Sequence, residues 1–469
     1  MKPLATLSLC VLAAACGAAQ PWDPLAGLSV VSGAGVLGAG CGSSTNPDYE
    51  AEPYLAVDPA DPLHWVGLWQ QGRYASGGGA QGLVSGVTFD GGKSWVLSQA
   101  PLDRCTGGNA ANGGDYDRVS DPWLAFGADG TVYQSGLAFT NGAASAVLVA
   151  KSLDGGRTWS SPTAVVRDLD PNIFNDKATI TADRADPQRL YAVWDRLTAF
   201  QSTDPALQTG AVWFARTGPG GWEAPRAIFD PGLNAQTLGN VLFQLPSGAL
   251  VDLLVVITQA SKAPVYTASS MTSFDQGATW STPVGFAQLQ GVGVSNPANG
   301  VGVRSGLSFA DFAMDPTTGR LYAVWEDARF SQGAHDAVAF STSADEGQTW
   351  SVPKAINGSA ATPAFGPNIA STPRGQVGVT YYDLRHSAGA QDPTAFEATA
   401  WFVESVDQGG TWQETPLTGA FNLGQAEIGQ TYFLGDYQGL AAAGETFVRL
   451  FAVAGPSASN PTDIVVKAL

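Results

Sequence analysis

The chain has 469 residues, of which 57 are glycine and 14 are tryptophan, while charged residues make up only 14 %. A composition so rich in turn formers and aromatic side chains excludes an intrinsically disordered chain and a coiled coil. The formal net charge is −18, and an acidic surface repels nucleic acid. Only three histidines are present, so neither a His-based metal site nor a His-dependent catalytic triad is expected.

The first 19 residues predict export. A basic start, an apolar stretch over residues 4–12 and three alanines at 13–15 have the layout of a secretory signal peptide. Cys16 follows directly, so the segment is either a lipoprotein signal with Cys16 acylated or a simple signal cleaved after Ala15 or Ala19. The protein is therefore expected to be a cell-envelope lipoprotein or a secreted protein, whose only membrane contact is a lipid on Cys16.

Two cysteines, Cys41 and Cys105, remain beyond the signal segment. In an oxidising compartment two lone cysteines most simply pair. We therefore expect a structural disulfide between them, which ties the N-terminal segment to the loop at 103–118.

One eight-residue motif, S/T-x-D-x-G-x-x-W, organises the rest of the chain. It occurs five times, starting at Thr88, Ser152, Ser273, Ser343 and Ser405. A worn copy at Thr217–Trp222 keeps only the glycines and the tryptophan, and the interval between copies is about 64 residues. The motif suits a hairpin turn, because Asp accepts backbone N–H groups, Gly supplies a positive φ and Trp buries its ring.

Each copy is preceded by two short apolar runs that are separated by a turn, as at 121–126 and 131–133. These runs predict a strand hairpin, and two more strands flank the Asp turn. A four-stranded sheet that repeats radially is a β-propeller, so the fold class is all-β. The first strands are expected at seven places: Tyr54, Trp123, Thr179, Leu242, Phe312, Ile369 and Leu440.

Seven blades are therefore favoured, with six as the alternative. The last unit lacks an outer strand, which residues 28–31 are expected to supply. The domain plan is a signal peptide at 1–19, an N-terminal segment at 20–47 that closes the ring, and one propeller domain at 48–469.

The five Asp motifs resemble the Asp boxes of the sialidase superfamily, and this resemblance covers roughly residues 48–469. It implies a sialidase-type propeller and an exported exo-alpha-sialidase-like glycoside hydrolase that acts on terminal sugars of extracellular glycans. In that mechanism three arginines bind the substrate carboxylate, a tyrosine activated by a glutamate is the nucleophile, and an aspartate is the acid and base. The Arg-Ile-Pro motif of sialidase propellers is missing here.

The resemblance implies the following site residues at strand starts and strand ends. The catalytic candidates are Asp121 or Asp176 as the acid, Glu52 as the partner of the nucleophile, and Tyr382 or Tyr437 as the nucleophile. The candidates for substrate binding are Arg196, Arg329 and Arg385 as the carboxylate clamp, with Arg73 and Asp436.

Two alternatives remain open. Arg196, Arg329 and Arg385 each follow an aspartate closely, so a repeated Asp–Arg pair that holds the blades together would explain them equally well. A non-catalytic propeller that binds a glycan or a protein is the alternative function. No cofactor is expected. Structural calcium in the Asp-rich turns stays open, although no stretch has EF-hand-like spacing for it. We expect a monomer whose partner is an extracellular glycan or glycoprotein.

Overall fold

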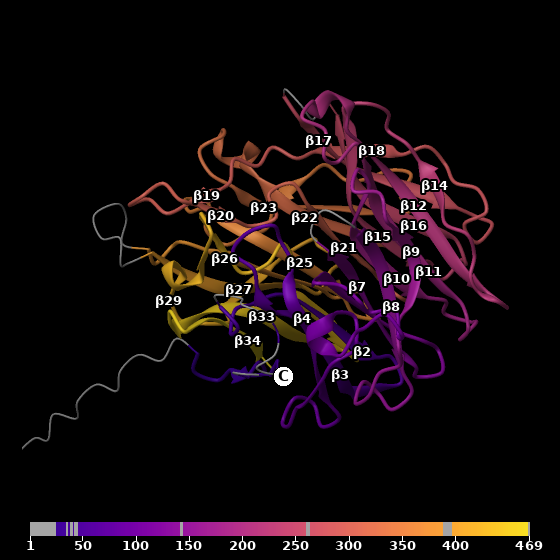
Figure 1. Cartoon of the computed structure of the whole chain (residues 1–469). Coiled ribbons are helices and arrows are strands. Elements are labelled where there is room, and N and C mark those ends of the chain that lie inside the picture. Colours follow the sequence, from indigo (N-terminus) through magenta and orange to yellow (C-terminus); the bar gives the residue numbers. More distant parts are fainter. Residues whose placement is uncertain are drawn as a thin grey trace, which may run out of the picture.

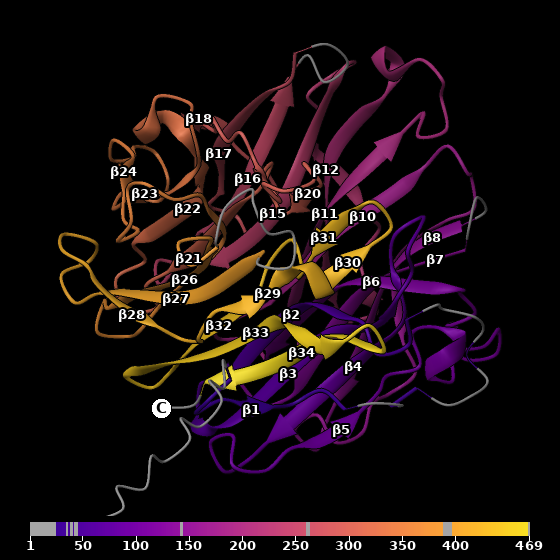
Figure 2. The same ribbon diagram turned by 90° about the vertical axis from the view of Figure 1, so that its left-hand side faces the viewer.

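The computed structural model describes residues 25–33, 36–37, 41, 46–140, 144–258, 263–387 and 396–467. The signal segment, including Cys16, lies outside the described residues. Within the described part, strands account for nearly all regular structure, with four short 3-10 turns and no α-helix. The predicted all-β class is confirmed, and strands fill the molecule in both views (Figures 1 and 2).

Most of the described strands pair into seven four-stranded antiparallel units, which we call A to G in chain order. Further pairings join unit A to unit B and unit C to unit D in two larger sheets. Units A and B contain β2 (Glu50–Asp58), β3 (Asp61–Arg73), β4 (Ala80–Thr88), β5 (Val96–Ser98), β6 (Arg118–Phe126), β7 (Val132–Thr140), β8 (Ala144–Ser152) and β9 (Thr163–Asp168). Units C and D contain β10 (Phe174–Ala182), β11 (Leu190–Thr198), β12 (Thr209–Gly218), β14 (Arg226–Phe229), β15 (Ala235–Gln244), β16 (Leu250–Thr258), β17 (Val265–Ser273) and β18 (Val284–Gln288).

The last three units follow the same order. Units E and F contain β21 (Ala310–Met314), β22 (Leu321–Asp327), β23 (Ala337–Ser343), β24 (Lys354–Ala355), β25 (Ala364–Ser371), β26 (Val377–Asp383), β27 (Glu397–Ser405) and β28 (Gln413–Pro416). Unit G contains β32 (Gly439–Ala443), β33 (Thr446–Ser457), β34 (Asn460–Lys467) and, from the other end of the chain, β1 (Ser29–Val30). Ser29 and Val30 pair with Val466 and Val465, so residues 28–31 supply the missing outer strand as expected.

The seven first strands lie side by side. Each contacts the first strand of the next unit, and β32 of unit G contacts β2 of unit A. Every residue that marked a first strand in the sequence lies in one of these strands: Tyr54, Trp123, Thr179, Leu242, Phe312, Ile369 and Leu440. Fully buried tryptophans in the second strands, Trp65, Trp69, Trp194 and Trp325, fill the space between the strand layers.

The five Asp turns, which join the third and fourth strands at residues 88–95, 152–159, 273–280, 343–350 and 405–412, share one hydrogen-bond pattern. At Asp345, the carboxylate accepts from the Ser343 hydroxyl, from the Thr349 N–H at 2.9 Å and from the Thr349 hydroxyl. Gly347 has a φ of 85°, as the turn requires. Strand order places these turns on the face opposite the starts of the first strands.

We expect Asp345→Asn to lower the free energy of unfolding by about 1 kcal/mol, because an amide cannot accept all three of these hydrogen bonds. Partial burial opposes the shift, but the hydrogen bonds from Thr349 and Ser343 lower the pKa of Asp345. This stabilisation is therefore present above the unfolded pKa and is lost as the pH falls below about 4. Denaturant titrations at several pH values measure the effect, with Glu346→Gln in the same turn as the control. An equal loss in both variants would contradict it.

Candidate active site

Five of the first strands contain a β-bulge near their start. At the bulge the backbone φ is positive: 52° at Glu52, 53° at Asp121 and 48° at Lys177. The equivalent residues in units D and F are Gly239 and Gly366. A left-handed conformation costs a non-glycine residue about 1–2 kcal/mol. Three charged side chains are thus held at strained positions, and such strain clusters at functional sites.

The ammonium of Lys177 is the centre of a buried charge cluster. Its Nζ lies 3.4 Å from Oε1 of Glu52, 3.1 Å from Oδ1 of Asp121 and 2.8 Å from Oδ2 of Asp436. The Phe309 and Tyr437 ring centroids are 5.1 and 5.3 Å from the same nitrogen. Units A, B and C and the connections D–E and F–G therefore meet at one atom.

Neighbouring polar groups fix the carboxylates of this cluster. Gln70 Nε2 donates to Glu52 and, at 3.0 Å, to the Ser120 hydroxyl, which donates to Asp121 at 3.2 Å. Arg304 forms a bidentate ion pair with Asp436, in which Nε lies 2.9 Å from Oδ1. The side chain of Arg304 is 46 % exposed, whereas that of Asp436 is 1 % exposed, so the guanidinium covers the carboxylate from the solvent side.

A small sheet positions Arg304 and Asp436 at the cluster. The connection from unit D to unit E contains β19 (Val294–Ser295) and β20 (Gly302–Arg304), and the connection from F to G contains β30 (Glu427–Ile428) and β31 (Thr431–Phe433). Strands β20 and β31 pair in parallel, with Arg304 opposite Phe433, and they lie together in Figure 2. Two distant connections thus depend on each other to form this side of the site.

The environments of the carboxyl groups differ strongly. Burial raises the pKa of Glu52 to about 7, although the charge of Lys177 opposes the shift. Burial would also raise the pKa of Asp436, but the charges of Lys177 and Arg304 hold it well below its usual range. Burial would lower the pKa of Lys177, but the surrounding carboxylates, Asp121 first, keep it well above its usual value. Lys177 and Asp436 are therefore ionised at neutral pH.

Asp176 and Asp121 form a pair of carboxyl groups beside the ammonium. Burial, the charge of Asp121 and a hydrogen bond between the two groups raise the pKa of Asp176 well above its usual range. The Lys177 backbone N–H lies 3.1 Å from Asp176 Oδ1 and 3.3 Å from Asp121 Oδ2. Asp176 is therefore protonated at neutral pH, since two adjacent carboxyl groups do not both ionise.

A pocket opens beside the cluster, with about 600 Å³ of empty space that includes its open mouth. Asp121, Lys177 and Asp436 contribute polar wall, while Trp123, Phe309 and Tyr437 contribute aromatic wall. A second space of about 880 Å³ continues along the first strands and is lined by residues from all seven units. Aromatic faces beside a few charged groups are typical of a small-molecule or sugar site.

The structure brings together five of the predicted residues and places a sixth next to them. Four of the five, Glu52, Asp121, Asp436 and Tyr437, lie at or beside Lys177, and Asp176 is paired with Asp121. The sixth, Arg73, is 5 % exposed and donates to Gln70, the amide that holds Glu52. Arg73 therefore acts on the cluster indirectly, by holding the Gln70 amide that binds Glu52.

The predicted arginine clamp is wrong. Arg196 pairs with Asp168 at 2.6 Å, Arg329 with Asp327 at 2.8 Å, and Arg385 with Asp383 and with Glu414 at 2.8 Å. The three guanidinium groups belong to units C, E and F, and none of them lines either cavity. The alternative that these arginines are structural is the one that the geometry supports.

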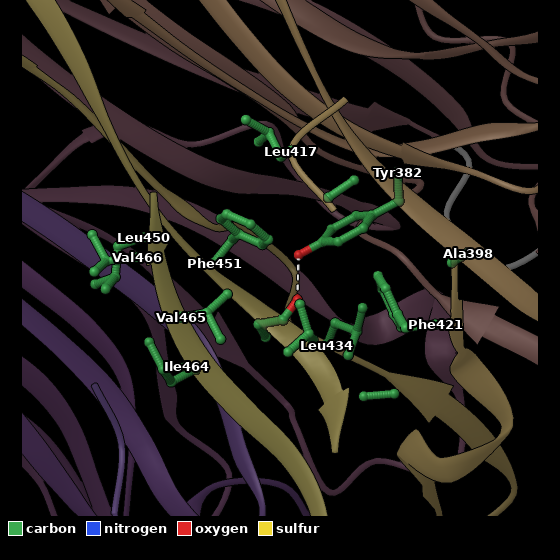
Figure 3. Packing of buried hydrophobic residues seen from close by; sticks show 14 of the residues in the cluster. Tyr382, Ala398, Leu417, Phe421, Leu434, Leu450, Phe451, Ile464, Val465 and Val466 are labelled. Atoms are coloured by element: carbon green, nitrogen blue, oxygen red, sulfur yellow. Dashed lines mark hydrogen bonds between the residues drawn. The ribbon is translucent and has the colours of Figure 1, made fainter. Parts of the chain in front are cut away.

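Tyr382 is not placed to be a nucleophile. It is 3 % exposed within the largest hydrophobic cluster, and its hydroxyl donates to the Ala452 carbonyl at 2.7 Å. Figure 3 shows its ring among Phe421, Phe451 and Leu434. The alternation of side chains along β26 turns Tyr382 into this core and away from the cavity.

We expect Tyr382→Phe to leave any activity of the protein unchanged and to cost about 1 kcal/mol of stability. The substitution removes one buried hydrogen bond and keeps the ring. Parallel measurements of turnover and chemical unfolding test both parts. Loss of activity in a variant that folds normally would show that Tyr382 has a role in the active site.

Tyr437 lies at the cavity but does not have the properties of an activated nucleophile. Its hydroxyl donates to the Pro122 carbonyl at 3.3 Å. Burial, followed by the charges of Glu52, Asp121 and Asp436, raises its pKa well above the usual value. A phenol in this setting stays protonated, so Tyr437 forms part of the aromatic wall.

The predicted disulfide is also absent from the structure. Cys41 and Cys105 are free thiols, and Cys41 Sγ donates to the Cys105 carbonyl at 3.5 Å. The two residues are thus neighbours, as the sequence indicated, and their side chains interact: burial, followed by a hydrogen bond with Cys41, raises the pKa of the Cys105 thiol.

Lys177 and Arg304 are the important residues that the sequence analysis missed. A signal for Lys177 existed: Glu52, Asp121 and Lys177 each stand two residues before the marker of a first strand, Tyr54, Trp123 and Thr179. Arg304 had no comparable signal, because it reaches the site through an inserted connection. Aligning the units on their bulges would have identified Lys177.

Metal and membrane features are lacking in the part of the chain that the structure describes. No group of three or more His, Cys, Asp or Glu side chains there has an arrangement that would hold a metal ion. No helix among these residues is long and apolar enough to cross a membrane.

No protein-family model and no curated protein sequence matches this chain. Among solved structures, it is similar to the Hadza microbial sialidase Hz136, with 15 % identity and a TM-score of 0.48 over 83 % of this chain and 73 % of that one. It is similar to an alpha-L-arabinanase of Penicillium chrysogenum, with 13 % identity and a TM-score of 0.47 over 90 % and 96 %. It is also similar to a leech intramolecular trans-sialidase, with 11 % identity and a TM-score of 0.45 over 90 % and 91 %. These likenesses are too distant to assign a chemistry, which has to be argued from the site itself.

Proposed function

We propose that this protein is a glycoside hydrolase that cleaves a neutral glycan in the cavity beside Lys177. The observation that supports it most is that two carboxyl sites at one cavity have opposite protonation states. The Asp121–Asp176 pair holds a proton, and Asp436 is held ionised. Two carboxyl groups with opposed protonation states are what glycosidic bond cleavage requires.

In this proposal the proton of Asp176 passes through its hydrogen bond to Asp121 and on to the glycosidic oxygen as the bond to the anomeric carbon breaks. The carboxylate of Asp436 stabilises the positive charge that develops on the sugar ring. Water then adds to the anomeric carbon, and the proton that it loses returns to the Asp121–Asp176 pair. Trp123, Phe309 and Tyr437 supply aromatic wall for the apolar face of the sugar. Because the arginine clamp is absent and the chain carries a charge of −18, a neutral sugar is favoured over sialic acid.

Binding without catalysis is the second candidate, and one observation favours it. Every charged group of the cluster already has a partner: Lys177 binds three carboxylates, and Arg304 binds Asp436. A cluster whose charges are all paired can form a rigid surface that binds a sugar without reacting with it.

We also infer that the seven units are the blades of one β-propeller, which β1 completes in unit G. The contact between β32 and β2 and the space lined by all seven units support this inference. The predicted signal at residues 1–19 supports a substrate outside the cell.

The test is hydrolysis of a panel of fluorogenic exo-glycosides, with neutral sugars and a sialoside, by the full mature chain. Asp176→Asn is the site variant, and Asp183→Asn, a buried aspartate on the opposite face, is the matched control. Release from a neutral glycoside that only Asp176→Asn abolishes supports the hydrolase. Saturable binding of a glycan with no release supports the second candidate, and release from the sialoside alone would overturn the proposed specificity.

A further inference from the structure

The Asp turns close the seams between neighbouring units. In each of four turns a glycine carbonyl accepts a hydrogen bond from the preceding unit. The four pairs are Ser98 with Gly156, Arg226 with Gly277, Ser270 with Gly347 and Lys354 with Gly409. Gly277 and Gly409 lie so close to the rings of Phe214 and Phe340 that a Cβ at either glycine would clash. Each turn thus covers one face of the unit before it.

Unit C does not cover unit B in this way. Its worn motif forms a tight hairpin in which Thr217 pairs with Trp222 and Gly218 with Gly221, through the short strand β13 (Gly221–Trp222). No side chain or backbone atom lies within 4 Å of a Cβ placed at Gly220 or Gly221. The seam between units B and C is therefore left open on the face of the Asp turns.

The open seam is a groove of about 1440 Å³. Unit B contributes Tyr133, Lys151 and Thr163, and unit C contributes Gln188 and Trp222. The two aromatic rings are half-buried, which leaves part of each exposed, while Lys151, Thr163 and Gln188 are exposed. Rings that pack on the core below and leave one side to solvent are rigid platforms.

The chemistry of the groove suits an uncharged, hydroxyl-rich ligand. Hydroxyl, amide and ammonium donors surround the two aromatic platforms. The Lys151 ammonium is balanced by the carboxylate of Asp129, which lines the same groove. A locally neutral surface that combines aromatic faces with hydrogen-bonding groups favours neutral sugars over anionic polymers.

We propose that this groove is a second carbohydrate site, which binds a neutral polysaccharide between units B and C. It lies on the face of the Asp turns, away from the starts of the first strands where the Lys177 cluster is found. The site tethers the protein to a polymer and does not present that stretch of polymer to the cavity. This inference does not depend on whether the cavity is catalytic.

Affinity electrophoresis of the full mature chain in gels that contain xylan, mannan or laminarin tests the proposal, with polygalacturonate as the anionic contrast. We expect retardation by at least one neutral polymer, and binding about ten-fold weaker in Trp222→Ala. Phe274→Ala, which removes a 72 % exposed ring from an intact Asp turn, is the matched control and keeps full binding.

Trp222 also packs against the core, so a second variant guards against a folding defect. Lys151→Ala combined with Gln188→Ala changes only exposed side chains and is expected to weaken retardation as well. Asp176→Asn is expected to keep full retardation even where it abolishes hydrolysis, which separates this site from the proposed function. No retardation by any neutral polymer, or equal retardation of the wild type and both groove variants, overturns the proposal.

Discussion

Lys177→Met is expected to lower the free energy of unfolding by about 3–5 kcal/mol at pH 7. Methionine fills a similar volume, but the substitution leaves Glu52, Asp121 and Asp436 buried without their shared cation. Removing one partner of a buried ion pair has a cost of this size, because the remaining charge is uncompensated. Denaturant titration of the wild type and the variant measures the difference.

The pH dependence gives this prediction a distinctive sign. Without the ammonium the buried carboxyl groups take up protons more readily, and a group whose folded pKa is raised stabilises the fold at low pH. The difference between wild type and variant therefore narrows from pH 7 to pH 5. Lys93→Met, at an exposed lysine in an Asp turn, is the control and is expected to be neutral. A constant difference at both pH values would argue that lost packing is the cause.

Asp176→Asn is expected to reduce kcat at pH 7 by about 10²–10⁴-fold, the usual contribution of a general acid. The asparagine keeps the shape of the side chain but cannot share a proton with Asp121. In the wild type the raised pKa of Asp176 keeps the pair protonated at neutral pH, so activity falls as the pH rises through the pKa of the pair. The variant is expected to lose this alkaline limb.

Rate profiles from pH 4 to pH 9 on the neutral glycoside of the panel measure the two limbs. Asp183→Asn again serves as the control, because its carboxylate accepts from Tyr191 and Gln244 far from the cavity. An unchanged profile in a folded Asp176→Asn protein would remove the pair from the mechanism. The fall in rate at low pH is expected to remain in Asp176→Asn, since that part of the profile reports protonation of groups other than Asp176.

The repeating units could be predicted from the sequence because the contacts that define them join residues close together in the chain. An Asp turn is closed by contacts between residues two to four positions apart, such as Ser343 with Asp345 and Asp345 with Thr349. The hairpin of β10 and β11 likewise pairs residues that are close in the chain, from Ala182 with Leu190 to Phe174 with Leu197. The resemblance to the sialidase superfamily rests on the same local turns.

The candidate site could be predicted only in part from the sequence. The wrong predictions of site residues share one cause. Which way a side chain points at the end of a strand depends on the register of a bulge and on the insertions that cross over it. Arg329 and Arg385 turn back onto Asp327 and Asp383, whereas Arg304, from an insertion, reaches Asp436, which is 132 positions away. Sequence spacing could not distinguish these outcomes.

What the sequence determined by itself is the all-β class, the Asp turns, the seven first strands and the acidic residues at their starts, because short-range hydrogen bonds and the alternation of side chains specify them. What only the tertiary structure decided is that Lys177 sits at the centre of three carboxylates and that the seam beside Trp222 is open. Both depend on contacts between residues that are far apart in the chain, where packing and electrostatics in three dimensions choose the partners.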